Sequence, residues 1–434
     1  MQGKNMPSQG PENRGGGWPR RYTLVGLCFL GTLICYIDRV NISLAAISMQ
    51  EQFGWSDTTK GYVLSSFFLG YLASQVLGGA LANRLGGKIV LGFAVIWWSV
   101  FTLLTPAAAF ISLGVLIATR ILMGFGEGMA FPSMYNLYGR WIPQNEKSRA
   151  VAATFSGISL GTLAALILTG PIIERYNWQA VFYIFGALGF IWFFFWQRLV
   201  SNSPQTHPTI TAAELQFIEE NAETAKRTET VPWKGLLSSP AIWAIIINHF
   251  CANWGFYVLL AWLPSYFKTA WGLSLTGAGL ASAAPWLSMF LMTNVAAWIA
   301  DEQIKRGISV RYVRKQQQTI GLVGAAVFLF LVRGLESGQS TLAIIYLCCS
   351  LGLLSFVLSG FGTNHLDVAP RYADVLLGIT NTAGTLPGII GVFITGYLVE
   401  QTGSFDVAFA LASGIFIFGA AVFLVFAKGE KLFD

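Results

Sequence analysis

Twelve long apolar stretches follow one another along the chain, separated mostly by short polar segments. Most are about 20 residues or longer, the length that an α-helix needs to cross a lipid bilayer. They are continuous, which excludes the alternating ten-residue strands of a membrane barrel. The pattern predicts an all-α polytopic membrane protein with spans near 22–49, 61–82, 88–106, 111–138, 150–173, 179–197, 240–267, 276–300, 317–333, 341–361, 375–399 and 405–427.

One longer polar segment, residues 199–239, divides the spans into two halves of six helices, residues 22–198 and 240–427. Within it, Thr211 and Glu214 form a capping box, which predicts a soluble helix from there to about Ala225. The remaining residues, 1–21 and 428–434, are expected to be polar tails.

The two halves repeat one another. The stretch TGPIIERYNWQAVFYI begins at Thr169 and TGYLVEQTGSFDVAFAL begins at Thr395, at the ends of the fifth and eleventh expected spans. Both contain Thr-Gly, an apolar turn, Glu and a polar loop before the next helix. Two parallel six-helix repeats resemble the architecture of the major facilitator superfamily, in which substrate sits near the middle of the membrane between the halves.

Composition and charge agree with a membrane protein. Of 434 residues, 54% are hydrophobic and only 11% are charged, which excludes a soluble enzyme, a disordered scaffold and a secreted disulfide module. The net charge is +6, and 21 of the 27 Lys and Arg residues lie in segments on one side of the predicted spans. We therefore expect both termini to be cytoplasmic, and the basic charge to reflect topology and contact with anionic lipid rather than nucleic-acid binding.

Five cysteines lie in apolar stretches, and they form no metal-ligand pattern with the three histidines. They are interpreted as small buried side chains. We find no phosphate-binding glycine loop and no catalytic motif in a credible context. We expect a chain that is not an enzyme and has no cofactor and no metal.

Four ionisable residues fall inside predicted helices: Asp38, Arg39, Arg120 and Glu127. Each costs at least ~2.5–3.5 kcal/mol to insert into hydrocarbon, so it needs a partner or a watery cavity. Arg120 and Glu127 are two helical turns apart and share a face, about 10 Å apart along the axis. Asp38 and Arg39 are adjacent and point about 100° apart, so they cannot both face the same partner.

Two interpretations of these charges remain open. They could form internal ion pairs that hold the N-terminal half together. Alternatively, arginine binds an anion through its planar fork, while a carboxylate in a poorly hydrated cavity takes up a proton. The second interpretation favours a proton-coupled anion symporter, with Glu127 competing with the anion for Arg120.

Four stretches together resemble the anion:cation symporter family, which includes bacterial sugar-acid transporters and the sialin, vesicular glutamate and type I phosphate transporters. The resemblance covers nearly all of residues 22–427. It is carried by CYIDRVNIS (35–43), RILMGFGEGMAFPSMYNLYGRWIP (120–143), HFCANWGFYVLLAWLPSYF (249–267) and NHLDVAPRYADVLLGITNTAGTLPG (364–388).

The resemblance implies roles for seven residues: substrate contacts at Arg39, Arg120, Tyr36, Tyr71 and Asn381, and proton coupling at Asp38 and Glu127. The chain departs from the vesicular glutamate transporters at Leu64 and Ala252, and from the sugar-acid branch at Ile158. It therefore looks like a bacterial relative of the sialin group that carries a small organic anion.

The short loop at 50–59 and the absence of a glycosylation sequon in the external loops favour a bacterial inner membrane. We also expect a monomer. An efflux antiporter, a phosphate or amino-acid anion transporter of the same fold, and a transporter-like sensor are the alternatives. Sodium stays open as the coupling ion.

Overall fold

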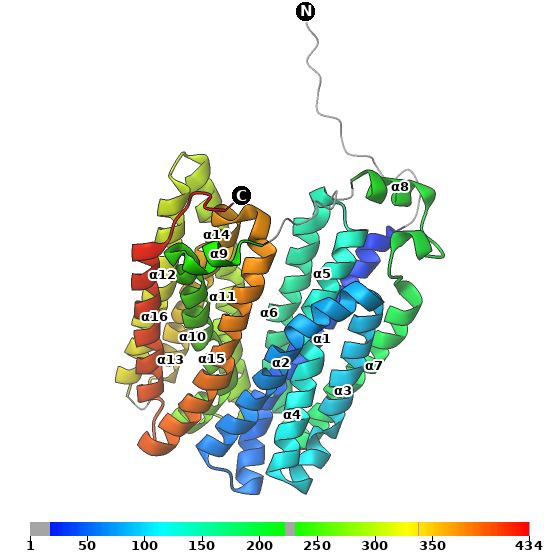
Figure 1. Cartoon of the computed structure of the whole chain (residues 1–434). Coiled ribbons are helices and arrows are strands. Elements are labelled where there is room, and N and C mark those ends of the chain that lie inside the picture. The colour runs from blue at the N-terminus through cyan, green and yellow to red at the C-terminus, as the bar shows by residue number, and fades with distance from the viewer. Residues whose placement is uncertain (1–17, 222–230, 337, 434) are drawn as a thin grey trace, which may run out of the picture.

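The computed structural model describes residues 18–221, 231–336 and 338–433. It contains 12 helical spans long and apolar enough to cross a membrane, so the predicted all-α, twelve-span architecture is confirmed. Figure 1 shows two bundles side by side, one from the first six spans and one from the last six. We call the end of the molecule that carries both chain ends the terminal face, and the opposite end the distal face.

The N-half consists of α1 (Arg20–Phe53), α2 (Asp57–Leu85), α3 (Gly87–Ile111), α4 (Leu113–Gly128) continued by α5 (Ala130–Trp141), α6 (Gln144–Arg175) and α7 (Trp178–Leu199). The C-half consists of α10 (Pro240–Trp271), α11 (Leu275–Lys305), α12 (Val310–Leu331), α13 (Ser340–Leu354) continued by α14 (Phe361–Val368), α15 (Ala373–Thr402) and α16 (Asp406–Phe426). The linker between them carries α8 (Ala212–Glu220) and α9 (Trp233–Ser238).

The first two spans of each half are connected in the same way. Gly54 ends α1 and Gly272 ends α10, both in the left-handed region with φ of 66° and 64°. Glycine adopts that conformation without a Cβ penalty, so it reverses the chain sharply at a helix end. Two residues later Ser56 and Ser274 cap α2 and α11 with their side chains. The short connections keep the distal ends of neighbouring spans close together.

Glycines bring α2 and α4 into backbone contact. A Cβ on Gly124 would overlap the Phe67 carbonyl, and a Cβ on Gly70 would overlap the Ile121 carbonyl. Small residues at such crossings let two membrane helices approach more closely than side chains normally allow. The contact places the inner face of α4 directly beside the aromatic residues of α2.

The fourth span is broken at Met129, between α4 and α5. Pro132 lies in the first turn of α5, where its missing N–H and its ring suit a helix start but not the interior of an unbroken helix. The sequence pattern predicted one uninterrupted apolar run here. The break lies two residues after Glu127, at the middle of the membrane span.

The linker helix starts where the capping box predicts, because the Thr211 hydroxyl accepts the Glu214 N–H at 3.2 Å. The Glu214 carboxylate, however, does not complete the capping box. It accepts the backbone N–H groups of Arg20 and Arg21, at 3.0 and 3.1 Å, and so caps the start of α1, a different helix. The described part of α8 ends at Glu220, and the predicted end near Ala225 lies outside the described residues.

Contacts between the halves gather at the distal face and at the middle of the bundle. In Figure 1 the two bundles meet toward that face and diverge toward the chain ends. Tyr62 packs in a tilted geometry against Phe393 with ring centroids 4.5 Å apart, and Phe68 packs edge-on against Tyr257 at 4.6 Å. The arrangement is closed on the distal side.

The α2–α4 contact leads to a stability prediction. Gly124→Ala should lower the free energy of unfolding by about 1–3 kcal/mol, because its methyl group overlaps the backbone of α2. Gly139→Ala, at a helical glycine with open space around it, is the control and should change stability by no more than about 1 kcal/mol. Thermal unfolding in detergent measures both. Equal melting temperatures for the two variants would contradict the packing described here.

Candidate transport site at the centre of the bundle

A buried ion pair joins α1 to α4. The Nε and Nη2 atoms of Arg39 both donate to Oε2 of Glu127, at 3.0 and 2.8 Å, and the side chains are 3% and 0% exposed. The Cys35 thiol donates to the same oxygen at 3.1 Å. The other carboxylate oxygen, Oε1, has no hydrogen-bond partner among the described residues. One oxygen of Glu127 therefore carries the whole contact.

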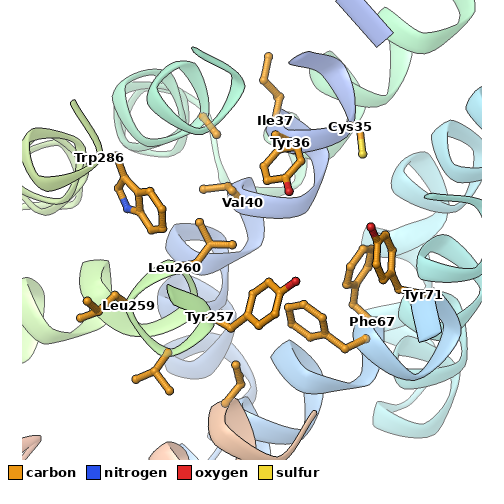
Figure 2. Packing of buried hydrophobic residues seen from close by; sticks show 14 of the residues in the cluster. Cys35, Tyr36, Ile37, Val40, Phe67, Tyr71, Tyr257, Leu259, Leu260 and Trp286 are labelled. Carbon is orange, nitrogen blue, oxygen red and sulfur yellow. The ribbon is translucent and has the colours of Figure 1, made fainter. Parts of the chain in front are cut away.

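Aromatic rings surround the Arg39 guanidinium. Its Cζ lies 4.6 Å from the ring centroids of Tyr36 and Tyr71 and 4.9 Å from that of Phe67. Cation–π contacts of this kind stabilise a desolvated cation. Figure 2 shows Tyr36, Tyr71 and Tyr257, from α1, α2 and α10, around a common space toward which their hydroxyl groups turn. The aromatic rings thus hold the guanidinium in place without occupying all of its N–H donors.

Arg120 is a second buried cation, 1% exposed, and it has a different environment. Its Nη1 contacts the Met123 sulfur at 2.9 Å, and its Cζ lies 5.5 Å from the Phe67 ring centroid. Among the described residues no carboxylate is within ion-pair distance of it, and its Nε has no partner. A thioether is a weak acceptor, so this guanidinium keeps donors available for an anion.

Asp38 is the second buried carboxylate of the N-half. It is 0% exposed, and neither of its oxygens has a hydrogen-bond partner within the described part of the chain. Burying a carboxylate without a hydrogen-bond donor is costly, so this side chain is an unsatisfied polar group at the centre of the N-half.

A small cavity of about 20 Å³ separates the two arginines, lined from the N-half by residues that include Arg39, Arg120 and Ser43, and from the C-half by Tyr257 and Leu260. That volume is enough for one water molecule. It is too small for an organic molecule in this conformation.

Asn381 lies on the terminal side of this cavity and joins the two halves. Its amide donates to the Gln75 side-chain carbonyl at 2.7 Å, and the Gln75 amide donates to the Thr385 hydroxyl at 3.2 Å. All three side chains are neutral, so breaking the bridge leaves no buried charge. The bridge connects α2 to α15.

The structure brings the sequence-predicted residues together but changes one pairing. We expected Glu127 to act on Arg120 from the same face of one helix, whereas its ion pair is with Arg39 on the neighbouring helix. The glycines of α4 pack against α2 and α3, so the long side chains of Arg39 and Glu127 themselves span the distance between α1 and α4. Asp38 and Arg39 have separate surroundings, as their angular offset predicts.

Three residues of this site were not singled out from the sequence as site residues: Cys35, Phe67 and Tyr257. Cys35 is one helical turn before Arg39, which places both on one face of α1. Tyr257 lies in the quoted stretch 249–267, which contains several other aromatic residues, so nothing in the sequence set it apart. Only the turn spacing of Cys35 gave a usable signal in advance.

Comparison with known proteins places this geometry in context. The family model described as Major Facilitator Superfamily matches residues 28–392. The Arabidopsis thaliana ascorbate transporter, chloroplastic, is 43% identical over 96% of this chain and 76% of its own. The sodium-dependent phosphate transport protein 1, chloroplastic, from the same plant is 42% identical over 96% of this chain and 81% of its own.

Human sialin is 37% identical over 94% of this chain and 90% of its own length. Among solved structures, a D-xylose–proton symporter superposes with a TM-score of 0.76 at 16% identity, covering 94% of this chain and 98% of that one. At that identity the superposition supports the shared fold.

The Arg39–Glu127 pair leads to a stability prediction by a double-mutant cycle. Arg39→Met leaves a buried carboxylate without its partner and should destabilise the protein by about 3–5 kcal/mol. Adding Glu127→Gln to Arg39→Met removes that charge and should recover part of the loss. Melting temperatures of the parent, both single variants and the double variant measure the coupling. Strictly additive effects would contradict a direct ion pair.

Proposed function

Because the chain belongs to the major facilitator superfamily, and within it to the anion:cation symporter family, we propose that it is a secondary transporter that carries a small organic anion together with protons by alternating access. One observation supports this most directly. The fork of Arg39 is occupied by Glu127 in a buried aromatic site, next to an Arg120 that has no carboxylate partner.

Proton coupling follows from the shared use of Arg39. When Glu127 is ionised it holds the Nε and Nη2 donors that an anion would use. When Glu127 takes up a proton the attraction weakens, and the fork becomes free to bind a carboxylate in a bidentate way. Proton and anion then favour one another, and the coupling is reciprocal by linkage.

Asp38 supplies a second place for a proton. Its oxygens have no donors, so the charged form is poorly stabilised and its protonation state responds to charges that enter the site. An anion beside Arg120 would reduce the positive potential that favours ionised Asp38. Asp38 is accordingly proposed as a proton carrier that does not itself touch the substrate.

The proposed substrate contacts come from both halves. Arg39 and Arg120 supply positive charge. Tyr36 and Tyr71, whose rings contact the Arg39 guanidinium, supply hydroxyl groups. Asn381 supplies an amide from the C-half. A hydroxylated organic anion, such as a sugar acid, fits this donor set, and a relative of this chain is named as a transporter of ascorbate, which is also a hydroxylated anion.

Inorganic phosphate is the second candidate, with sodium in place of protons. It is favoured by the relative named as a sodium-dependent phosphate transport protein. Uptake into proteoliposomes, under an imposed proton or sodium gradient and with ascorbate, sugar acids, sialic acid, amino acids and phosphate in turn, distinguishes the two. Accumulation of no organic anion under a proton gradient would refute the leading proposal.

Orientation and compartment belong to the same proposal. The concentration of Lys and Arg on one side of the spans supports cytoplasmic termini. The distal connection between α1 and α2 is only the segment from Gly54 to Ser56, in keeping with the short loop that favoured a bacterial inner membrane. We also propose that the monomer is sufficient for transport, since every group of the site comes from one chain.

Glu127→Gln should separate binding from coupling. The amide imitates the protonated acid, so the variant should still exchange labelled for unlabelled anion but lose accumulation driven by a proton gradient. Counterflow and gradient-driven uptake in the same liposomes measure the two steps. Glu302→Gln makes the same chemical change at the end of α11 on the terminal face and should retain both. Full accumulation by Glu127→Gln would eliminate it as the coupling acid.

Arg120→Lys should weaken anion binding at least about tenfold, because lysine keeps the charge but loses the planar fork. The apparent affinity in counterflow measures this. Arg175→Lys, at an exposed position on the distal face, provides the matched control and should bind like the parent. A parent-like affinity for Arg120→Lys would remove Arg120 from the set of substrate ligands.

A further inference from the structure

The sequence repeat at the ends of the fifth and eleventh spans reappears in the structure as a contact between the halves. Glu174, near the end of α6, reaches the start of α11 in the other half. Its Oε1 accepts the Thr276 backbone N–H at 3.0 Å, and its Oε2 accepts the Thr276 hydroxyl at 2.6 Å. Thr276 is the second residue of α11, so the carboxylate covers a free N–H of the helix start.

The other half returns the same contact. Glu400, near the end of α15, accepts the Thr58 backbone N–H with Oε2 at 2.8 Å. Thr58 is the second residue of α2, the position in the N-half that corresponds to Thr276 in the C-half. The two contacts are therefore reciprocal: each carboxylate belongs to one half and binds the start of a helix in the other half.

A glycine one helical turn before each glutamate makes the approach possible. A Cβ on Gly170 would lie 2.7 Å from the Leu275 carbonyl, and a Cβ on Gly396 would overlap the Asp57 carbonyl. Leu275 and Asp57 are the first residues of α11 and α2. Residues four apart share a helix face, so glycine and glutamate together form one surface that fits a helix start.

We infer that Glu174 and Glu400 are paired latch residues that hold the distal face closed and are released each time the transporter opens to that side. This role goes beyond the proposed substrate and coupling ion and depends on neither.

Intrahelix capping does not account for these contacts. Ser56 and Ser274 already cap α2 and α11 from within their own halves, by accepting the N–H groups of Thr59 and Gly277. The glutamates add a charged contact that crosses the boundary between the halves. A carboxylate at a helix start is stabilised by the helix dipole, so both contacts lower the free energy of the conformation in which the distal face is closed.

The contacts also have the properties that a reversible latch needs. Both glutamates are exposed at the rim of the bundle, so water can solvate the carboxylates and the helix N–H groups after separation. No charge is therefore left buried at these contacts when the halves part. Opening therefore requires breaking two surface hydrogen-bonded contacts that re-form without a large barrier.

The test measures the distance between the halves at the distal face. Spin labels are placed at Tyr176→Cys in the N-half and Ala270→Cys in the C-half, both exposed positions on the distal face that take no part in the latch hydrogen bonds. The parent chain without added cysteines gives the background from native thiols. We expect the parent to populate mainly the short distance in liposomes, without any added substrate.

Glu174→Gln and Glu400→Gln should each raise the ratio of the long-distance to the short-distance population about two- to fivefold, and the double variant should multiply these effects. Glu51→Gln, an exposed carboxylate on the same face, is the charge-matched control and should leave the distribution unchanged.

Thr276→Val removes only the hydroxyl contact and should shift the distribution in the same direction by less, which keeps the test usable if the double variant does not fold. Distributions for the folded glutamate variants that match Glu51→Gln would overturn the inference. The distance distribution does not depend on whether Glu127 couples transport to protons. The latch inference and the proposed function can therefore be refuted independently of each other.

Discussion

The ion pair between Arg39 and Glu127 is the interaction around which the centre of this molecule is organised. Four ionisable groups of the N-half lie in the membrane interior, yet only these two form an ion pair. Desolvation makes a buried pair a weak source of stability, and losing one partner is costly. A pair that contributes little when formed, but must not be left half broken, suits a site where a proton and an anion arrive together.

The geometry of that pair depends on backbone packing some distance from the charges. Gly124 and Gly70 allow α2 and α4 to touch, which brings Phe67 and Tyr71 against the guanidinium of Arg39. With larger residues at this crossing the helices would separate, and the rings would no longer surround the cation. Because the hydrophobic effect does not drive helices together in lipid, close packing of this kind determines how the helices of a membrane site are positioned. Stability of the crossing and integrity of the site are therefore linked.

The sequence alone was sufficient for features that follow from one helix at a time. Twelve spans, the start of the linker helix at Thr211 and the four buried charges all come from hydropathy, caps and spacing. It was insufficient where two helices meet. Helical periodicity placed Glu127 on the face of Arg120, but the partner depends on which side chain of another helix reaches the carboxylate, and Arg39 of α1 does. For the same reason the carboxylate of Glu214 was read as part of its own capping box, whereas it caps α1.

Symmetry and asymmetry are divided between two regions of the molecule. The latches at the distal face obey the repeat residue by residue, since Glu174 with Thr276 mirrors Glu400 with Thr58. The centre does not: the ionisable groups of the proposed site come from the N-half, and the C-half contributes neutral groups such as Tyr257 and Asn381. If the halves rock as rigid bodies, the four charges keep their mutual distances, and only neutral contacts are made and broken around them. In the proposed cycle, proton and anion binding then act on charges whose positions are fixed, while the paired surface contacts hold the distal face closed.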